Sequence, residues 1–177
     1  MKRIIITLIP ILIISACSDD FLDRAPINRR VIENFYQTPQ DAYEGLVATY
    51  DKLQWDDWGH FHIWSEILGD NCHGGTGKSD GSGAQELERF IPNQGENNIY
   101  PWRKYYTGIA HANLILERLD GVDWGARPEL KAIYEAEAKF LRAYFYFDLV
   151  RLFGNVPLTT KVLAPDEAVS ITPVSYT

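Results

Sequence analysis

The chain has 177 residues, a length that suits one domain with a sizeable buried core. Its 24 Asp and Glu outnumber 17 Lys and Arg, which argues against nucleic acid as a partner, because a phosphate backbone recruits clusters of basic side chains. Aromatic residues make up 13% of the chain, and such side chains serve cores and interfaces and stack on sugar rings.

The N-terminus has the pattern of a bacterial lipoprotein signal. A basic start precedes an apolar run at residues 4–14, which is too short for a bilayer, since a spanning helix needs about 20 residues. The run ends in Ile-Ser-Ala-Cys, which resembles the lipobox, in which the cysteine becomes the first mature residue and carries acyl chains. We predict a signal peptide at 1–16 and lipidation of Cys17. The alternative is a plain secreted protein with a cysteine near its cleavage site.

Residues 17–37 are predicted to be the lipidated N-terminus and a polar tether. Their acidic pair, Asp19 and Asp20, resembles the tag carried by lipoproteins that Bacteroidetes move to the cell surface. An ordinary solvated linker would have the same composition. We expect a protein anchored to the outer membrane and facing outside.

The first helix of the domain is predicted to begin at Pro39. Thr38 suits the N-cap and Asp41 can complete a capping box. We expect the helix to end near Asp57. Its predicted apolar face has the helical period and consists of Ala42, Leu46, Tyr50 and Leu53.

The helical pattern breaks between Gly59 and Asn98. A short helix fits residues 61–68, whereas five glycines predict a loop from Cys72 to Ala84. A loop of this length in a compact domain is usually functional or mobile. After Cys17, Cys72 is the only cysteine, so we expect no intramolecular disulfide and a small buried thiol.

Two long helices with a short connector are predicted next, as an antiparallel hairpin. One begins at Pro101 and stops near Asp120, and the other runs from Arg127-Pro128 to Phe153, where Gly154 ends it. The predicted inner face of the second helix consists of Ala132, Ala136, Phe140, Ala143, Phe147 and Val150, with Glu135 and Lys139 as an outer pair.

This helix pair resembles a tetratricopeptide (TPR) unit in its Ala136-x₃-Phe140 spacing and in Pro157. Such units need neighbours, and only one full copy is visible. Residues 158–177 contain two prolines, Pro165 and Pro173, and no closing element is predicted, so the chain looks unfinished. The predicted fold class is all-α, with TPR-like hairpins and long loops over residues 38–177.

Nucleotide and metal sites are not expected. Gly77-Lys78-Ser79 resembles the end of a P-loop, but Cys72 stands where that motif needs glycine. The possible metal ligands lack zinc spacing and are His60, His62, Asp70, Cys72 and His73. We predict no metal and no cofactor.

Other polar residues allow several interpretations. Glu66 with Asp70, or Glu86 with Glu88, could form the carboxylate pair of a glycosidase, which sequence spacing alone does not test. In the helical hairpin we expect Asn113 to be a core amide bonded to a helix or a loop carbonyl, and Arg142 to be a buried anchor for a carboxylate.

Several stretches resemble one family. Residues 136–158 (AEAKFLRAYFYFDLVRLFGNVPL) look like the signature helix and exit of the SusD/RagB family, the surface glycan-binding lipoproteins of Bacteroidetes. The lipoprotein start, residues 64–71 and the Trp102–Asn113 pattern agree in order. The resemblance covers nearly the whole chain but only the front of the family's fold, so we expect a truncated, incomplete SusD-like fold.

The resemblance implies a lipoprotein that captures an oligosaccharide or another nutrient and caps a SusC-like TonB-dependent barrel transporter, without enzymatic chemistry. An early binding loop of the family falls at residues 70–84, where the ligand candidates are Asn71, His73, Lys78 and Asp80. This loop has no aromatic residue, so no stacking tryptophan is carried over. The alternatives are a helical-repeat scaffold that binds a protein partner and a surface glycosidase.

Overall fold

The computed structural model describes residues 31, 35–54, 61–75, 77, 79–80, 82–91 and 96–176. The predicted signal peptide, Cys17, the acidic pair and Lys78 lie outside the described residues. The chain divides into residues 1–35 and a compact unit at residues 36–177. Within the described ranges, no helix combines the length and the apolar character that crossing a membrane requires.

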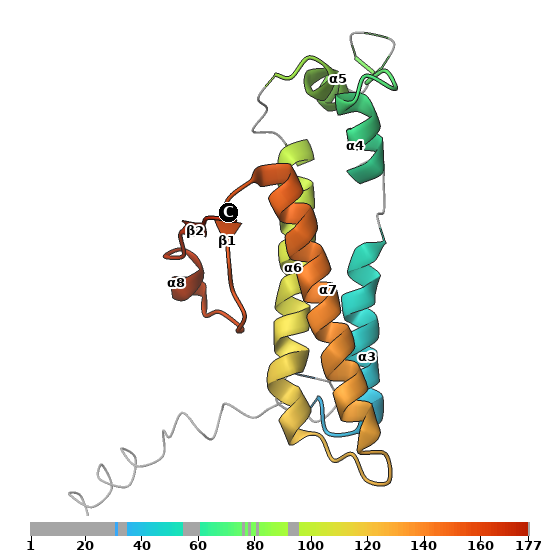
Figure 1. Cartoon of the computed structure of the whole chain (residues 1–177), viewed down its shortest axis with the longest axis vertical. Coiled ribbons are helices and arrows are strands. Elements are labelled where there is room, and N and C mark those ends of the chain that lie inside the picture. The colour runs from blue at the N-terminus through green and yellow to red at the C-terminus, as the bar shows by residue number, and fades with distance from the viewer. Residues whose placement is uncertain are drawn as a thin grey trace, which may run out of the picture. The chain divides into compact units, whose positions relative to one another are not determined.

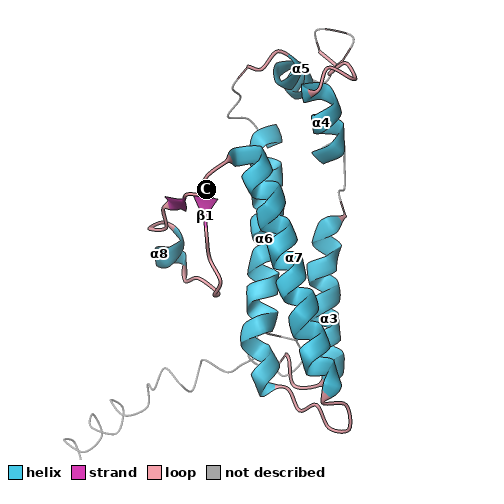
Figure 2. Cartoon of the chain, viewed as in Figure 1, coloured by secondary structure: helices cyan, strands magenta, loops and turns pink. Residues whose placement is uncertain are grey.

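Three helices form the body of the compact unit (Figure 1). They are α3 (Pro39–Tyr50), α6 (Glu96–Arg118) and α7 (Glu129–Phe153). The two long helices α6 and α7 form the expected antiparallel hairpin, and α3 packs against both and runs parallel to α7. Helix dominates the described residues, as Figure 2 shows, which confirms the predicted all-α class.

Helix α3 begins as its capping residues predict. The Asp41 N–H donates to Thr38 Oγ1 at 3.2 Å, and the Thr38 N–H donates to Asp41 Oδ2 at 2.9 Å. The helix ends at Tyr50 and a 3₁₀ turn, η1 (Asp51–Leu53), follows, so the predicted end near Asp57 is too late. The predicted face is half right, because its first two members are buried and its last two exposed; buried in α3 are Ala42, Gly45, Leu46 and Thr49.

Helix α6 begins at Glu96, five residues before the predicted start at Pro101. The sequence prediction places Pro101 in the first turn, where proline is favoured. In the structure it lies inside the helix, where the missing N–H of proline costs one backbone hydrogen bond. The helix passes into a second 3₁₀ turn, η2 (Leu119–Gly121), close to the predicted stop.

The core lies between α6 and α7. Its buried side chains are Tyr105, Ile109, Ala112 and Ile115 from α6 and Ala138, Leu141, Phe145 and Leu149 from α7. Gly108 permits the closest approach, since a Cβ atom there would lie 2.5 Å from Cε2 of Phe145. The two helices therefore meet at a glycine of α6 rather than at the predicted alanines of α7.

The predicted inner face of α7 is wrong. Phe140 and Phe147 are 67% and 59% exposed, and Ala132, Ala136 and Ala143 are exposed with them, while Val150 is half-buried. Helix α7 carries apolar residues on two faces, so its helical period alone does not say which face meets α6. The outer pair is confirmed, with Lys139 Nζ 2.5 Å from Glu135 Oε1.

The end of α7 agrees with the sequence. Gly154 has φ 72°, a left-handed conformation that favours glycine, and its N–H donates to the Val150 carbonyl at 2.9 Å. The chain then forms β1 (Val156–Pro157), the short helix α8 (Pro165–Ala168) and β2 (Pro173–Val174). The two strands pair antiparallel, Val156 opposite Val174, so a small closing element exists where none was predicted.

Two short helices flank the predicted loop. Helix α4 (Phe61–Leu68) has the predicted bounds and buries Trp64 and Ile67. Helix α5 (Ser82–Glu88) begins inside the predicted loop, whose last three residues are therefore helical. Gly74, Gly75 and Gly77 lie in irregular structure as expected of helix breakers, whereas Gly83 lies inside α5.

Candidate ligand-binding loop and exit segment

The loop begins where α4 stops. The Asn71 N–H donates to the Glu66 carbonyl at 2.8 Å and the Asp70 N–H to the Ile67 carbonyl at 3.2 Å, the two bonds of a Schellman motif. Asp70 has φ 65°, a position usually taken by glycine and tolerated by aspartate. This turn presents Asn71 to solvent.

The carboxylate of Glu88, in α5, fastens the first half of the loop. His73 Nδ1 lies 2.9 Å from Glu88 Oε1, and the Gly74 N–H donates to Glu88 Oε2 at 3.2 Å. The hydrogen bond with Glu88 raises the pKa of His73, and the bonds from His73 and Gly74 lower the pKa of Glu88. Gly74 is required, because a Cβ atom there would lie 2.4 Å from the backbone of Ala84.

Gln85, also in α5, fastens the second half. Its Nε2 donates to the carbonyls of Gly77 at 2.6 Å and Asp80 at 2.5 Å. Sequence reasoning missed both Gln85 and Glu88 as organising residues. Gln85 and Glu88 are three residues apart, so they share one face of a helix, and this spacing is the feature of the sequence that could have indicated their role.

Of the four predicted ligand candidates, three lie within the described residues. Asn71, His73 and Asp80 are exposed on this loop, and Lys78 lies outside the described part. Cys72 is exposed too, so the expectation of a buried thiol is wrong. Cys72 lies in the turn after α4 between the exposed residues Asn71 and His73, so its side chain faces solvent and not the core. No group of three or more His, Cys, Asp or Glu could hold a metal ion in the described ranges.

A second polar cluster holds the segment that leaves α7. Asn113 is 1% exposed, and its Nδ2 donates to the carbonyls of Thr159 at 3.3 Å and Lys161 at 3.0 Å. Arg142 Nη1 donates to Asn113 Oδ1 at 2.7 Å and to the Thr160 carbonyl at 3.3 Å. Asn113 is thus the predicted core amide. Arg142, half-buried, binds an amide and a carbonyl instead of the predicted carboxylate.

Further side chains of the hairpin bind the same exit segment. The Tyr146 hydroxyl donates to the Thr159 carbonyl at 3.0 Å and accepts from the Thr159 N–H at 2.7 Å. Tyr106 donates to the Pro157 carbonyl at 2.6 Å, and Glu117 accepts from the Val162 N–H at 2.6 Å. The exit after the signature helix is therefore fixed by side chains of both α6 and α7.

Comparison with known proteins gives consistent results. Residues 20–173 match the SusD-like family described as "Starch-binding associating with outer membrane". SusD-like protein P38 of Formosa agariphila is 31% identical over 163 residues, which cover 90% of this chain and 31% of that protein. A SusD-like protein of Bacteroides ovatus is 31% identical over 155 residues, covering 83% of this chain and 26% of its own.

A solved structure has the same fold. It is a laminarin-binding SusD-like protein, with a TM-score of 0.68 and 35% identity, and the match covers 79% of this chain and 31% of that one. The chain thus spans about a third of the length of the relatives that it matches. With the family match over residues 20–173, these likenesses identify the chain as a member of the SusD-like family, whose N-terminal portion it represents.

Proposed function

We propose that this protein captures an oligosaccharide at the outer face of the outer membrane, anchored by acyl chains on Cys17. The observation that carries the proposal is the likeness to a laminarin-binding SusD-like structure at 35% identity. The family's description, starch binding in association with the outer membrane, supports the same kind of ligand and the same location.

The loop after α4 supports a role in ligand contact. It presents an amide, an imidazole and a carboxylate, from Asn71, His73 and Asp80, which are the groups that exchange hydrogen bonds with sugar hydroxyls. Its backbone is held by Gln85 and Glu88. A fixed loop loses less conformational freedom when a ligand binds than a loose one.

The carboxylates near the loop suit a protein that binds the oligosaccharide without cleaving it. A glycosidase needs a carboxylic acid of raised pKa to protonate the leaving oxygen. Glu88 has the opposite environment, because His73 and the Gly74 N–H stabilise its charged form. Glu88 therefore does not suit the role of general acid in a catalytic pair with Glu86.

We further propose that the protein caps a SusC-like TonB-dependent barrel and hands the captured oligosaccharide to it. The α6–α7 hairpin offers a rigid scaffold, because polar bonds to the exit segment and a packed core hold it. Co-purification of the barrel with the tagged protein from membranes tests this step. Recovery of the protein without a barrel partner, under conditions that preserve outer-membrane complexes, would contradict it.

Titration calorimetry with laminari- and malto-oligosaccharides tests glycan capture. Because the chain spans about a third of its relatives, we expect weak binding, with a dissociation constant of about 1 mM. Joint replacement of Asn71, His73 and Asp80 by alanine should weaken it further, while Ser170→Ala, an exposed change elsewhere, should not. Equal affinity of both variants would remove the loop from the site. Shortened sugar products would indicate the glycosidase instead.

A second candidate function is a scaffold that binds a protein partner without a glycan. The exposed apolar face of α7, with Phe140 and Phe147, favours it, since large exposed apolar side chains in a group often mark interaction surfaces. Replacement of both by serine should then abolish recovery of a protein partner without altering sugar binding.

A further inference from the structure

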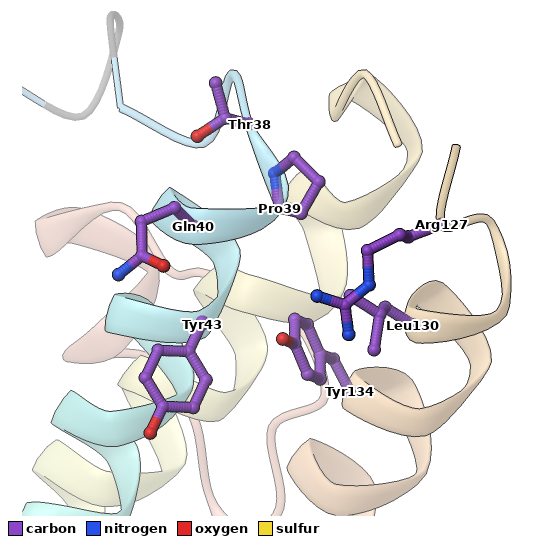
Figure 3. Close-up of a pocket in the computed structure, with 7 residues that line it drawn as sticks. All are labelled: Thr38, Pro39, Gln40, Tyr43, Arg127, Leu130 and Tyr134. Carbon is purple, nitrogen blue, oxygen red and sulfur yellow. The ribbon is translucent and has the colours of Figure 1, made fainter. Parts of the chain in front are cut away.

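An open pocket of about 490 Å³ lies between the first turns of α3 and α7 (Figure 3). Because the two helices are parallel, their N-terminal ends lie at the same end of the helical body. The volume falls within the range of small-ligand sites. The residues lining it mix aromatic and polar side chains and are Thr38, Pro39, Gln40, Tyr43, Arg127, Leu130 and Tyr134.

Two tyrosines form an aromatic wall of this pocket. The rings of Tyr43 and Tyr134 have centroids 6.3 Å apart and are inclined by 43°. Trp124 packs edge-on against Tyr134 at 5.8 Å, and its Nε1 donates to the Leu119 carbonyl at 3.2 Å. Contact with Trp124 therefore restrains the ring of Tyr134, while the side chain of Tyr43, 49% exposed, remains accessible to a ligand.

The polar groups of the pocket are available to a ligand. Among the residues that the structure describes, the hydroxyls of Tyr43 and Tyr134 bond to no side chain or backbone group. Arg127 is largely exposed, and its Nε lies 3.8 Å from Glu129 Oε1, a distance that leaves most of its five donors to solvent. Figure 3 shows its guanidinium group beside Leu130 and Tyr134. Gln40 makes one long bond, 3.3 Å, to Glu44.

We infer that this pocket binds a neutral pyranose unit of an oligosaccharide. The C–H face of the sugar packs on Tyr43 and Tyr134, and its hydroxyls exchange hydrogen bonds with Arg127, Gln40 and the phenols. Acidic sugars fit less well, because the carboxylates of Glu44 and Glu129 lie beside Gln40 and Arg127. The inference rests on the proposed function in one respect, that the ligand is a glycan.

The pocket has an aromatic surface, which the loop after α4 lacks. That loop has no aromatic residue between Asp70 and Ala84, so it offers hydrogen bonds without a stacking surface. Sugar recognition in water needs apolar contact as well, since each hydroxyl gives up its hydration when it binds. Tyr43 and Tyr134 offer such a contact at a second site, separate from the loop.

Calorimetric titration of the full chain in detergent with laminarihexaose and maltohexaose tests the pocket. We expect Tyr43→Ala and Arg127→Ala each to weaken binding by about three- to tenfold. Tyr176→Ala removes a more exposed tyrosine outside the pocket and should leave the affinity unchanged. Thermal melts show whether each variant is folded.

Fluorine NMR of the chain labelled with 3-fluorotyrosine gives a second readout, in which sugar binding is followed in the unmutated protein. The resonances lost in Tyr43→Phe and Tyr134→Phe identify the two pocket tyrosines, and they should shift when the hexaose is added. If the chain binds the sugar while both signals stay fixed, the pocket inference fails and glycan capture stands. If no binding is detected, both fail.

Discussion

The guanidinium group of Arg142 donates to the amide oxygen of Asn113 at 2.7 Å, and this bond sets the orientation of a buried amide. With Oδ1 facing a donor, Nδ2 faces the carbonyls of Thr159 and Lys161. A buried carbonyl without a donor is unfavourable, so both partners are needed. Two helices and the exit segment thus meet at one side chain.

Asn113→Asp should destabilise the fold. The carboxylate would keep Arg142 as a partner but would turn an acceptor toward the two carbonyls that Nδ2 now serves. We expect a loss of about 1–3 kcal/mol in the free energy of unfolding, measured by urea titration. Asn155→Asp, the same change at an exposed site, is the control and should have little effect. Equal losses would show that charge alone is responsible.

Local chemistry made part of the fold predictable. Thr38 and Asp41 bond within four residues of each other, so the start of α3 follows from the sequence alone. The contacts that failed are not local. His73 meets Glu88 fifteen residues away, and no spacing rule selects that partner among the acidic residues of the region. The choice between the two apolar faces of α7 depends on which neighbour packs there, and Gly108 of α6 decides it.

Gly108→Ala should destabilise the hairpin. Alanine has the better helix propensity, by about 1 kcal/mol, but its methyl group would meet the buried ring of Phe145 at 2.5 Å. Overpacking of a core contact typically costs about 1–3 kcal/mol, so we expect a net loss of about 1–2 kcal/mol by urea unfolding. Gly121→Ala, where no atom lies within 4 Å, should be neutral. An unchanged Gly108→Ala protein would mean that α6 and α7 lie further apart.

Ala143→Trp should be tolerated by this chain. The residue lies on the face of α7 that the sequence placed inside, where a tryptophan would be strongly destabilising. Its exposure predicts a change within about 0.5 kcal/mol instead. Leu141→Trp, at a buried position two residues away, is the matched comparison and should lower the melting temperature clearly. A large loss for Ala143→Trp would show that something covers this face.

Cys17→Ala should abolish lipid attachment, because Cys17 alone follows the apolar signal. Metabolic labelling with a fatty acid and partition into detergent measure the effect. Cys72→Ala removes the other cysteine and should leave the label in place. A labelled Cys17→Ala protein would contradict the lipoprotein prediction. Replacement of Asp19 and Asp20 by alanine should keep the lipid and reduce protease accessibility on whole cells.

His73 should titrate above its ordinary pKa of 6.5, because the Glu88 carboxylate stabilises its charged form. The raised pKa means that the stabilisation by this pair is complete below pH 6.5 and is lost as the pH rises through the folded-state pKa of His73. The lowered pKa of Glu88 sets the other limit. Its contribution is present above the ordinary value of 4.5 and is lost as the pH falls through the folded-state pKa of Glu88.

The loop after α4 should therefore be most stable between about pH 4.5 and pH 6.5. Titration of the imidazole signals by NMR measures the pKa of His73, and hydrogen exchange of the Gly74 amide follows the loop. Glu88→Gln should return the pKa toward 6.5 and speed this exchange, since the neutral amide binds both donors more weakly. Glu86→Gln removes a charge from the same helix without touching the pair and should alter neither. If both variants lower the pKa of His73 equally, the summed negative charge of α5, and not the hydrogen bond to Glu88, raises that pKa.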